Sequence, residues 1–172
     1  RISSTSTQIN EKNNKKGDWH ADWPFCVFNG GNINKPFPKK VLHITCIFML
    51  VDFNKNVGST LVRPRSHLLD TNPTFEGDPY YGSYDDQVNI EGSAGSVFLM
   101  DSRLWHASDT NKSDKRRTSL VVRYAPWWLN LEVFRPGSYD RKKIIEDKNK
   151  FGSLYPSVTK IAFDKIDDDV KH

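Results

Sequence analysis

Residues 41–53, with the sequence VLHITCIFMLVDF, decide the fold class of this chain. The stretch is rich in β-branched and aromatic residues and is apolar on both faces, a pattern typical of a strand buried inside a sandwich. A helix is the competing interpretation, but the β-branched content disfavours it. We therefore expect a long buried strand here and an all-β fold around it.

Shorter β segments lie downstream of this strand. Residues 54–58 are typical of a turn and residues 59–62 of a returning strand that Pro64 ends, so the sequence predicts a hairpin. Residues 69–87 are rich in Asp, Pro, Gly and Tyr without any period, which predicts a long loop. Further strands are expected at residues 95–101, 104–108 and 118–125.

The two ends of the chain carry weaker signals. Residues 1–18 are polar, and Gln8-Ile9-Asn10 is their one indication of a strand. Residues 137–151 show a helical pattern, for a helix that would be largely solvated. A chain of 172 residues suits a single domain with a real core. We expect a β core over residues 1–136 and a helical, charged extension over residues 137–172.

Composition narrows the range of partners and compartments. The net charge of +4 comes from 25 Lys and Arg against 21 Asp and Glu, and the basic residues are scattered, so we expect no nucleic acid partner. No apolar run approaches the length of a membrane span, so we expect no membrane partner. The two cysteines, Cys26 and Cys46, suit free thiols in a reducing compartment, which favours a cytoplasmic location.

The most informative motif is His20-Ala21-Asp22, with His106 far downstream. Residues two apart on an extended segment point to the same side, so His20 and Asp22 share a face. Two neutral imidazoles and one carboxylate suit non-haem Fe(II) and leave positions open for a chelating co-substrate and for dioxygen. Because Asp22 and His106 are distant in sequence, only a fold that returns the chain can join them. A jelly roll does so by pairing distant strands.

A second anchor is Arg117, which follows His106 by eleven residues. Its planar fork is suited to hold the far carboxylate of a dicarboxylic acid whose other end chelates the metal. The neighbouring Arg116 is unsuited, because its side chain leaves the opposite face of the strand when Arg117 points inward.

Each of these residues also has an ordinary structural interpretation. A His-x-Asp motif arises readily from composition alone, and His106 beside Trp105 would by itself be a structural histidine. His43, in the apolar strand, is the rival metal ligand, against the alternative of a hydrogen-bonded core histidine. The order of the motifs together, rather than any one of them, supports the metal site.

That order resembles the phytanoyl-CoA dioxygenase family of Fe(II)/2-oxoglutarate-dependent oxygenases, from about residue 8 to residue 131. The segment GSVFLMD at residues 95–101 leads to WHAS at residues 105–108, and Arg117 opens the last core strand. Residues 56–67, NVGSTLVRPRSH, resemble the family's Gly-rich hairpin and its Pro-Gly-Ser-His turn, with Arg65 in place of the usual glycine. The resemblance implies a double-stranded β-helix, the cupin-like jelly roll. The family's preceding helices and first strands have no counterpart in these residues.

The resemblance also implies roles for individual residues. His20, Asp22 and His106 would bind Fe(II), and Arg117 would pair with the distal carboxylate of the co-substrate 2-oxoglutarate. Ser108 would donate its hydroxyl to the same carboxylate, with a turn-forming serine as the alternative. By similarity to the strand before the metal motif in a member of the family, Asn10 would contact 2-oxoglutarate as well, with a solvated amide as the alternative.

Large side chains near the motifs are candidates for the substrate side of the site. Trp23 and Phe25 follow the metal motif and could wall the pocket or belong to the core. Trp127 lies where the last strand would leave the barrel, so it could close the pocket or cover an edge. Arg123 has the same parity as Arg117 and could meet an acidic substrate, with a surface charge at the strand end as the alternative.

The activity implied by the resemblance is oxidative. A small-molecule substrate would be hydroxylated with O₂, and 2-oxoglutarate would leave as succinate and CO₂. Asp22 favours hydroxylation over halogenation, because related halogenases carry a small residue in place of this carboxylate. Desaturation and ring closure use the same ligands and stay open as outcomes. Two other classes stay open at this point. One is a non-catalytic, metal-binding jelly-roll module that holds a ligand, and the other is a cupin-like metalloenzyme such as an isomerase, which would have no use for Arg117.

Overall fold

Regular structure in the described part of this chain is almost entirely β-sheet. The computed structural model describes residues 2–23, 36–73 and 80–126. Within them lie the strands β1 (Ile2–Asn10), β2 (Ile44–Met49), β3 (Thr60–Val62), β4 (Val88–Asn89), β5 (Val97–Asp101), β6 (His106–Ser108) and β7 (Arg117–Tyr124). Two short 3-10 helices, η1 (Lys55–Val57) and η2 (Ser66–Leu68), flank β3. None of the described helices is long and apolar enough to cross a membrane.

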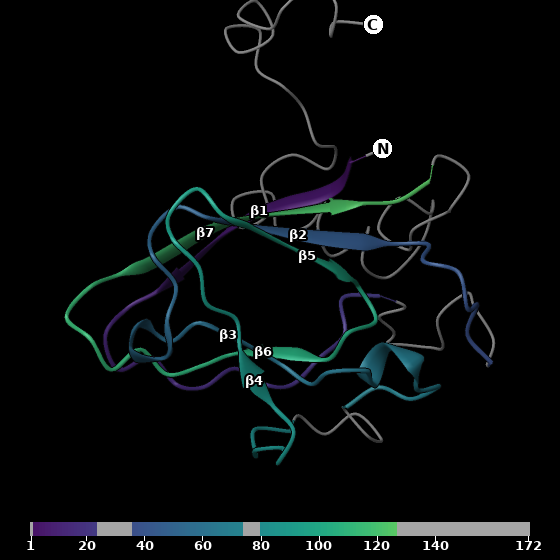
Figure 1. The fold of residues 1–172 in the computed structure, drawn as a ribbon, viewed down its shortest axis with the longest axis horizontal. Helices are drawn as coiled ribbons and strands as arrows, with labels where there is room; N and C mark the ends of the chain where they lie inside the picture. The colour runs from purple at the N-terminus through teal and green to yellow at the C-terminus, as the bar shows by residue number, and fades with distance from the viewer. Residues whose placement is uncertain (1, 24–35, 74–79, 127–172) are drawn as a thin grey trace, which may run out of the picture.

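The strands form two antiparallel sheets that lie one above the other (Figure 1). The four-stranded sheet has the order β1-β7-β2-β5, and the three-stranded sheet has the order β4-β3-β6. The long strand β7 runs between β1 and β2, so the last described strand lies beside the first. Pairing of strands distant in sequence is the jelly-roll arrangement, and the predicted double-stranded β-helix is confirmed.

Strand alternation divides the apolar side chains into two clusters. One lies between the sheets and comprises Ile47, Met49, Phe53, Met100 and Val121. The other comprises Trp19, Ala21, Leu61, Trp105 and Ala107. In β3 and β6, members of this second cluster alternate with Thr60, His106 and Ser108, which line the space between the sheets. β6 therefore has one apolar face, with Ala107, and one polar face, with His106 and Ser108.

The buried strand predicted over residues 41–53 exists, but it is shorter. β2 ends at Met49 because the chain turns there: the amide of Gly95 donates to the carbonyl of Met49, and the amide of Ala94 donates to the Asp52 carboxylate. Phe53 then forms an isolated bridge with Gly92. The apolar sequence pattern does not reveal this turn, because Met49 before it and Phe53 after it are both buried.

The predicted hairpin between residues 41–53 and 59–62 is wrong. β2 pairs with β5 and β7, whereas β3 pairs with β4 and β6 in the other sheet. Residues 54–58 do turn, with the Asn54 side chain capping η1, but they carry the chain across from one sheet to the other. At Gly58, where φ is +70°, an added Cβ would lie 2.7 Å from the Asn111 nitrogen, so this crossing packs tightly against the neighbouring loop.

The other predicted strands are found at nearly the expected positions. Gln8-Ile9-Asn10 proves to be the end of a nine-residue strand that pairs with β7 from Ile2 to Asn10. Its Ser and Thr content hid it, because an edge strand needs few apolar residues. The short strand β4 was not predicted. Cys46 is buried and free, whereas Cys26 and the predicted helix at residues 137–151 lie outside the described residues.

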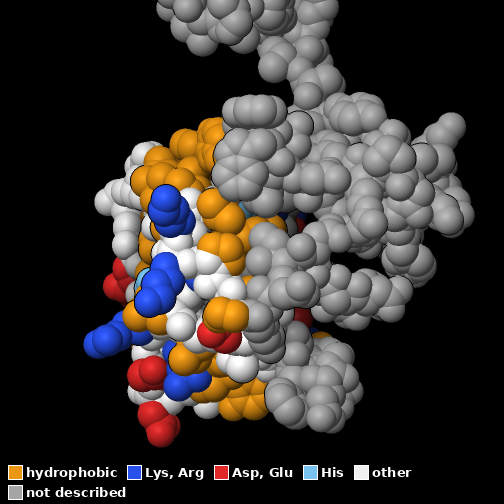
Figure 2. Space-filling view, turned by 90° about the vertical axis from the view of Figure 1, so that its right-hand side faces the viewer, with side chains coloured by type: hydrophobic (Ala, Val, Ile, Leu, Met, Phe, Trp, Pro, Cys, Tyr) orange, Lys and Arg blue, Asp and Glu red, His pale blue; other side chains and the backbone are white. Residues whose placement is uncertain are grey.

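Charged side chains of both signs are spread over the surface. Figure 2 shows one side of the molecule. On its described part, lysine, arginine, aspartate and glutamate side chains lie among apolar and neutral ones. Mixed charges of this kind produce a weak field that physiological salt screens within about 8 Å.

Arg65 occupies a backbone conformation that favours glycine. Its φ is 65° and its ψ is −1°, and its side chain makes no capping hydrogen bond. Because this region costs an L-residue about 1–2 kcal/mol, and glycine loses part of that gain as chain entropy, we expect Arg65→Gly to stabilise the fold by about 0.5–1 kcal/mol. Thermal unfolding of Arg65→Gly beside Arg65→Ala measures this. A gain shared equally by both variants would contradict the backbone explanation.

Candidate metal centre

Two histidines from different parts of the chain are held side by side by their backbones. His20 and His106 form an isolated antiparallel bridge, in which each amide donates to the other's carbonyl at 3.0 and 2.9 Å. Their ring centroids lie 4.2 Å apart. Asp22, two residues after His20, joins the same face, while Ala21 between them packs into the core. The strand alternation expected from the sequence therefore operates here.

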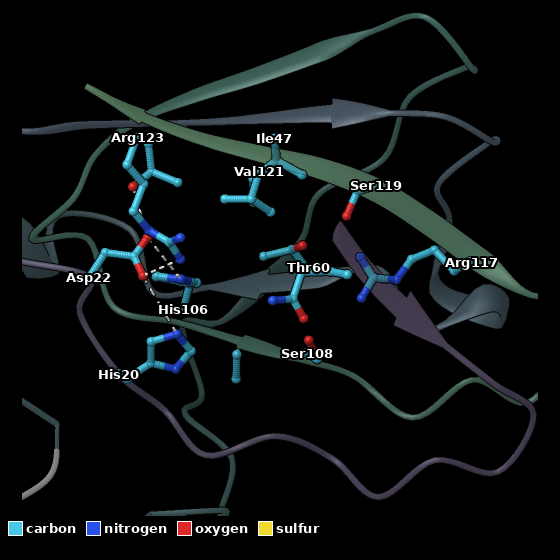
Figure 3. A pocket seen from close by; sticks show the side chains of 13 residues that line it. His20, Asp22, Ile47, Thr60, His106, Ser108, Arg117, Ser119, Val121 and Arg123 are labelled. Carbon is cyan, nitrogen blue, oxygen red and sulfur yellow. Dashed lines mark hydrogen bonds and ion pairs between the residues drawn. The ribbon is translucent and has the colours of Figure 1, made fainter. Parts of the chain in front are cut away.

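The three side chains present one ligand atom each to a common point. Nε2 of His20 lies 4.0 Å from Oδ1 of Asp22, and Nε2 of His106 lies 3.7 Å from Oδ2. One ligand atom from each residue falls within 4.8 Å of the other two. Figure 3 shows them gathered at one end of a pocket between the sheets. The predicted His20, Asp22 and His106 are thus brought together.

Both imidazoles have the tautomer that a metal ligand requires. Nδ1 of His20 lies 3.0 Å from the Asp18 carbonyl, and Nδ1 of His106 lies 2.9 Å from the Leu104 carbonyl. A carbonyl only accepts, so each Nδ1 carries the proton and each Nε2 keeps its lone pair for the shared point. Backbone carbonyls that orient ligand histidines in this way are a regular feature of metal sites.

The charges at the cluster suit a divalent cation. Burial lowers the pKa of His106 to about 4, so this ring is neutral at physiological pH. Burial by itself would raise the pKa of Asp22, but the charges of His106 and Arg123 and the hydrogen bonds from Arg123 and Thr45 hold it well below its usual range. Because His106 is neutral near pH 7, Arg123 is the cation that pairs with the Asp22 carboxylate there.

The far end of the pocket contains a buried arginine that has no counterion among the described residues. Arg117 is 2% exposed, and its Nε has no hydrogen-bond partner among the described residues. Its guanidinium carbon lies 4.8 Å from the centre of the Phe53 ring. Burial lowers the pKa of Arg117 to about 10, which leaves it charged at neutral pH. A buried cation with no ion-pair partner in this part of the chain is costly, so this end of the pocket suits an anionic group.

Polar side chains line the pocket between the two ends. Ser108 is among them, as expected, together with Gln8, Thr60 and Ser119. Figure 3 shows Arg117 pointing toward Thr60 and Ser108. The Ser119 hydroxyl is buried without a hydrogen-bond partner in the described part of the chain, two residues along β7 from Arg117. Ser119 was not among the predicted site residues, although its parity with Arg117 places it on the same face.

The other candidates from the sequence are placed differently. Asn10 does not line the pocket, because its amide donates to the carbonyls of Gly58 and Asp109; Gln8, one step back on the same face of β1, lines it instead. Trp23 is buried and stacks on His43 with ring centroids 6.1 Å apart, so it belongs to the core. Phe25 and Trp127 lie outside the described residues.

The structure also gives the positions of three other charged or titratable side chains that were considered from the sequence. His43 is a buried, hydrogen-bonded core histidine and not a member of the metal cluster. Arg116 is exposed and pairs with Glu11, as its parity predicts. Arg123 is not a surface charge: it donates to Oδ1 of Asp22 at 2.8 Å. Its parity was visible in the sequence, but its partner was not.

Protonation of the two buried histidines should weaken the metal-free fold in mild acid. The pKa of His43 and that of His106 are both about 4, below the ordinary value of about 6.5, so the unfolded chain binds more protons between these values. The free energy of unfolding should fall from about pH 6.5 toward pH 4, by up to about 1.4 kcal/mol per pH unit for each histidine. Urea unfolding at a series of pH values measures the slope, which His43→Leu should reduce. A slope unchanged by His43→Leu would contradict this reading of His43.

Comparison with known proteins agrees with the geometry. A sequence profile of the phytanoyl-CoA dioxygenase (PhyH) family matches residues 2–119, which include the whole metal cluster and Arg117. The chain belongs to this family. An uncharacterised protein of Mycobacterium tuberculosis is 34% identical over 80 residues, which make up 46% of this chain and 28% of that protein. A protein of Mycobacterium bovis matches to the same extent.

Several solved structures have the same fold. EctD from S. alaskensis in its apo form has a TM-score of 0.61 and 21% identity, over 82% of this chain and 49% of that one. The non-heme alpha ketoglutarate dependent carbocyclase SnoK from nogalamycin biosynthesis has a TM-score of 0.52 and 21% identity, over 73% of this chain and 49% of that one. The chain thus spans about half the length of these enzymes and a smaller part of the mycobacterial relatives. At these identities the structural likeness shows the shared fold.

Proposed function

We propose that this chain carries the Fe(II) and 2-oxoglutarate site of an oxygenase that hydroxylates a small-molecule substrate. The observation that supports it best is the pairing of two features in one pocket. A two-histidine, one-carboxylate cluster lies at one end, and the buried Arg117, for which the described residues offer no counterion, lies at the other. A metal alone needs only the first feature, and a metal with a dicarboxylic co-substrate needs both.

The metal cluster fits Fe(II) by its donor set. Two neutral imidazole nitrogens and one carboxylate are the ligands of the facial triad of non-haem iron oxygenases, which leaves coordination positions open. In this proposal His20, Asp22 and His106 hold the ion. When bound, Fe(II) supplies the redox chemistry that couples decarboxylation of 2-oxoglutarate by O₂, giving succinate and CO₂, to insertion of one oxygen atom into a C–H bond of the substrate.

The distal end fits the remote carboxylate of 2-oxoglutarate. Arg117 offers a forked pair of donors, and the burial of its guanidinium strengthens a charge-assisted hydrogen bond by excluding water. In this proposal Ser108 and Ser119 donate to the same carboxylate, because both line the pocket and the Ser119 hydroxyl has no partner within the described ranges. EctD from S. alaskensis, whose structure with 2-oxoglutarate and 5-hydroxyectoine has a TM-score of 0.57 and 20% identity over 77% of this chain and 46% of that one, shows that a protein with this fold holds 2-oxoglutarate.

Turnover of the co-substrate tests the proposed function. The full chain, loaded with Fe(II), should convert 2-oxoglutarate to succinate in the presence of O₂, slowly alone and faster with a substrate from a panel of hydroxylation candidates. Succinate is measured by chromatography, with the Asp22→Ala variant as the blank. Tight metal binding without any succinate above that blank would instead indicate a metal-binding module that holds a ligand without turnover.

A further inference from the structure

A row of buried polar side chains leads from β1 to the metal cluster. Ser3 Oγ lies 3.0 Å from Nε2 of His43, and Nδ1 of His43 lies 2.7 Å from Ser102 Oγ. Ser102 Oγ lies 2.7 Å from Thr45 Oγ1, which lies 2.7 Å from Oδ2 of Asp22. Ser3 and His43 are each 4% exposed, and Ser102 and Thr45 are fully buried. We name Ser3, His43, Ser102 and Thr45 the Asp22 chain.

The direction of every hydrogen bond in the Asp22 chain follows from the number of protons available. A carboxylate only accepts hydrogen bonds, so Thr45 donates its single hydroxyl proton to Asp22. Thr45 must then accept a hydrogen bond from Ser102, whose single hydroxyl proton is used in that bond. Ser102 must accept from Nδ1 of His43, so that nitrogen carries the imidazole proton. In the neutral ring Nε2 accepts, and Ser3 donates to it.

This arrangement delivers one fixed donor to one oxygen of Asp22. Arg123 donates to the other oxygen, Oδ1, at 2.8 Å. Each carboxylate oxygen accepts about two partners, so each keeps capacity for one more, on the side of the histidine Nε2 atoms. Donors in a directed row also polarise one another, which strengthens the last bond of the row.

The row is held by elements that cannot shift independently. Thr45 lies in β2 and pairs across the sheet with Met100, next to the end of β5 where Ser102 follows. The amide of Ser102 donates to the His43 carbonyl at 3.0 Å, and Trp23 stacks on the His43 ring at 9° between planes. The ring orientation, and with it the tautomer, is therefore set by packing as well as by hydrogen bonds.

We propose that the Asp22 chain is a positioning device for the metal ligand Asp22, in which His43 acts through Ser102 and Thr45 to fix the carboxylate's orientation. The inference rests on the proposed metal site. A purely structural role for these groups would change the stability of the fold in proportion to the bonds lost. If these groups position Asp22, substituting them also weakens metal binding, and the loss of affinity becomes smaller as the substituted residue lies further from Asp22 along the row.

Metal affinity of a set of matched variants tests the positioning role. The probe is Co(II), titrated into the full chain by calorimetry and followed by its visible spectrum. Thr45→Val keeps the shape and removes the last donor, so we expect about 10- to 100-fold weaker binding, whereas Thr45→Ser should stay near the wild type. Ser102→Ala should weaken binding less than Thr45→Val does. His43→Leu should have the smallest loss, and His43→Asn, which keeps a donor toward Ser102, should recover most of it.

Ser59→Ala is the control for Ser102→Ala. Ser59 is equally buried, and its hydroxyl accepts from Asn89 outside the Asp22 chain, so Ser59→Ala should change the unfolding midpoint without changing Co(II) affinity. Equal Co(II) affinity of wild type, Thr45→Val and Ser102→Ala would overturn the positioning role while leaving the metal site intact. If Thr45→Val does not fold, the comparison of Ser102→Ala with Ser59→Ala decides alone. A wild-type chain that binds no Co(II) would overturn the proposed metal site itself.

Discussion

Asp22→Ala should reduce metal affinity by at least about 100-fold and abolish succinate formation. The substitution removes the one anionic ligand from the cluster. It also leaves the Arg123 guanidinium, now without its partner at 2.8 Å, as a cation beside the two imidazoles. A positive charge in that position repels a divalent ion over a few ångströms of partly buried space, where charge interactions are several times stronger than in water. Co(II) titration and the succinate assay measure the two losses.

Two further variants separate the metal effect from a stability effect. Asp22→Ala alone should also lower the unfolding midpoint, because Arg123 loses its ion pair. The double variant Asp22→Ala/Arg123→Ala should regain part of the stability but none of the metal affinity. Asp86→Ala breaks the exposed pair with Arg63 and should leave metal binding unchanged. Metal binding by Asp22→Ala within a few-fold of the wild type would contradict the assigned ligand set.

Arg117→Met should raise the Michaelis constant for 2-oxoglutarate by about 30-fold or more while Co(II) affinity stays near the wild type. Methionine keeps most of the bulk of the arginine and removes the cation. Truncating one partner of a buried, hydrogen-bonded charge pair costs about 2–5 kcal/mol, and the lower value corresponds to about 30-fold. Steady-state kinetics at varied 2-oxoglutarate concentration gives the constant.

The same variant makes a second, opposite prediction for the protein without 2-oxoglutarate. Because the Arg117 guanidinium has no anionic partner among the described side chains, replacing it by an apolar group of similar volume should raise the unfolding midpoint of the co-substrate-free protein. Arg116→Met, on the exposed neighbour that pairs with Glu11, should change neither the Michaelis constant nor the midpoint appreciably. An unchanged Michaelis constant in Arg117→Met would remove this residue from the co-substrate site.

Strand periodicity explains why much of the site could be predicted. The period of two placed His20 with Asp22, put Arg117 inward, and put Arg116 outward, and the structure agrees in each case. The family resemblance supplied the long-range association with His106, which no local pattern contains. The fold class followed in the same way, since β-branched runs indicate strands and the resemblance indicates how they pair.

The parts that could not be predicted depend on contacts across the fold. The turn at residues 54–58 is visible in the sequence, but the sheet to which the next strand belongs is not, and the hairpin prediction failed for that reason. The partner of Arg123 and the link from His43 through Ser102 to Thr45 join residues many positions apart. Asn10 has the parity of Gln8, yet its amide is taken by loop carbonyls that the sequence does not bring near it.

Anaerobic spectroscopy tests most directly whether the cluster and Arg117 form one site. Fe(II) is added to the full chain without O₂, followed by 2-oxoglutarate, and the visible absorption is recorded for the wild type and for Arg117→Met. We predict a metal-to-ligand charge-transfer band that appears only when both are present and that requires a much higher 2-oxoglutarate concentration in Arg117→Met. A wild-type chain that binds Fe(II) but develops no such band at saturating 2-oxoglutarate would contradict the account.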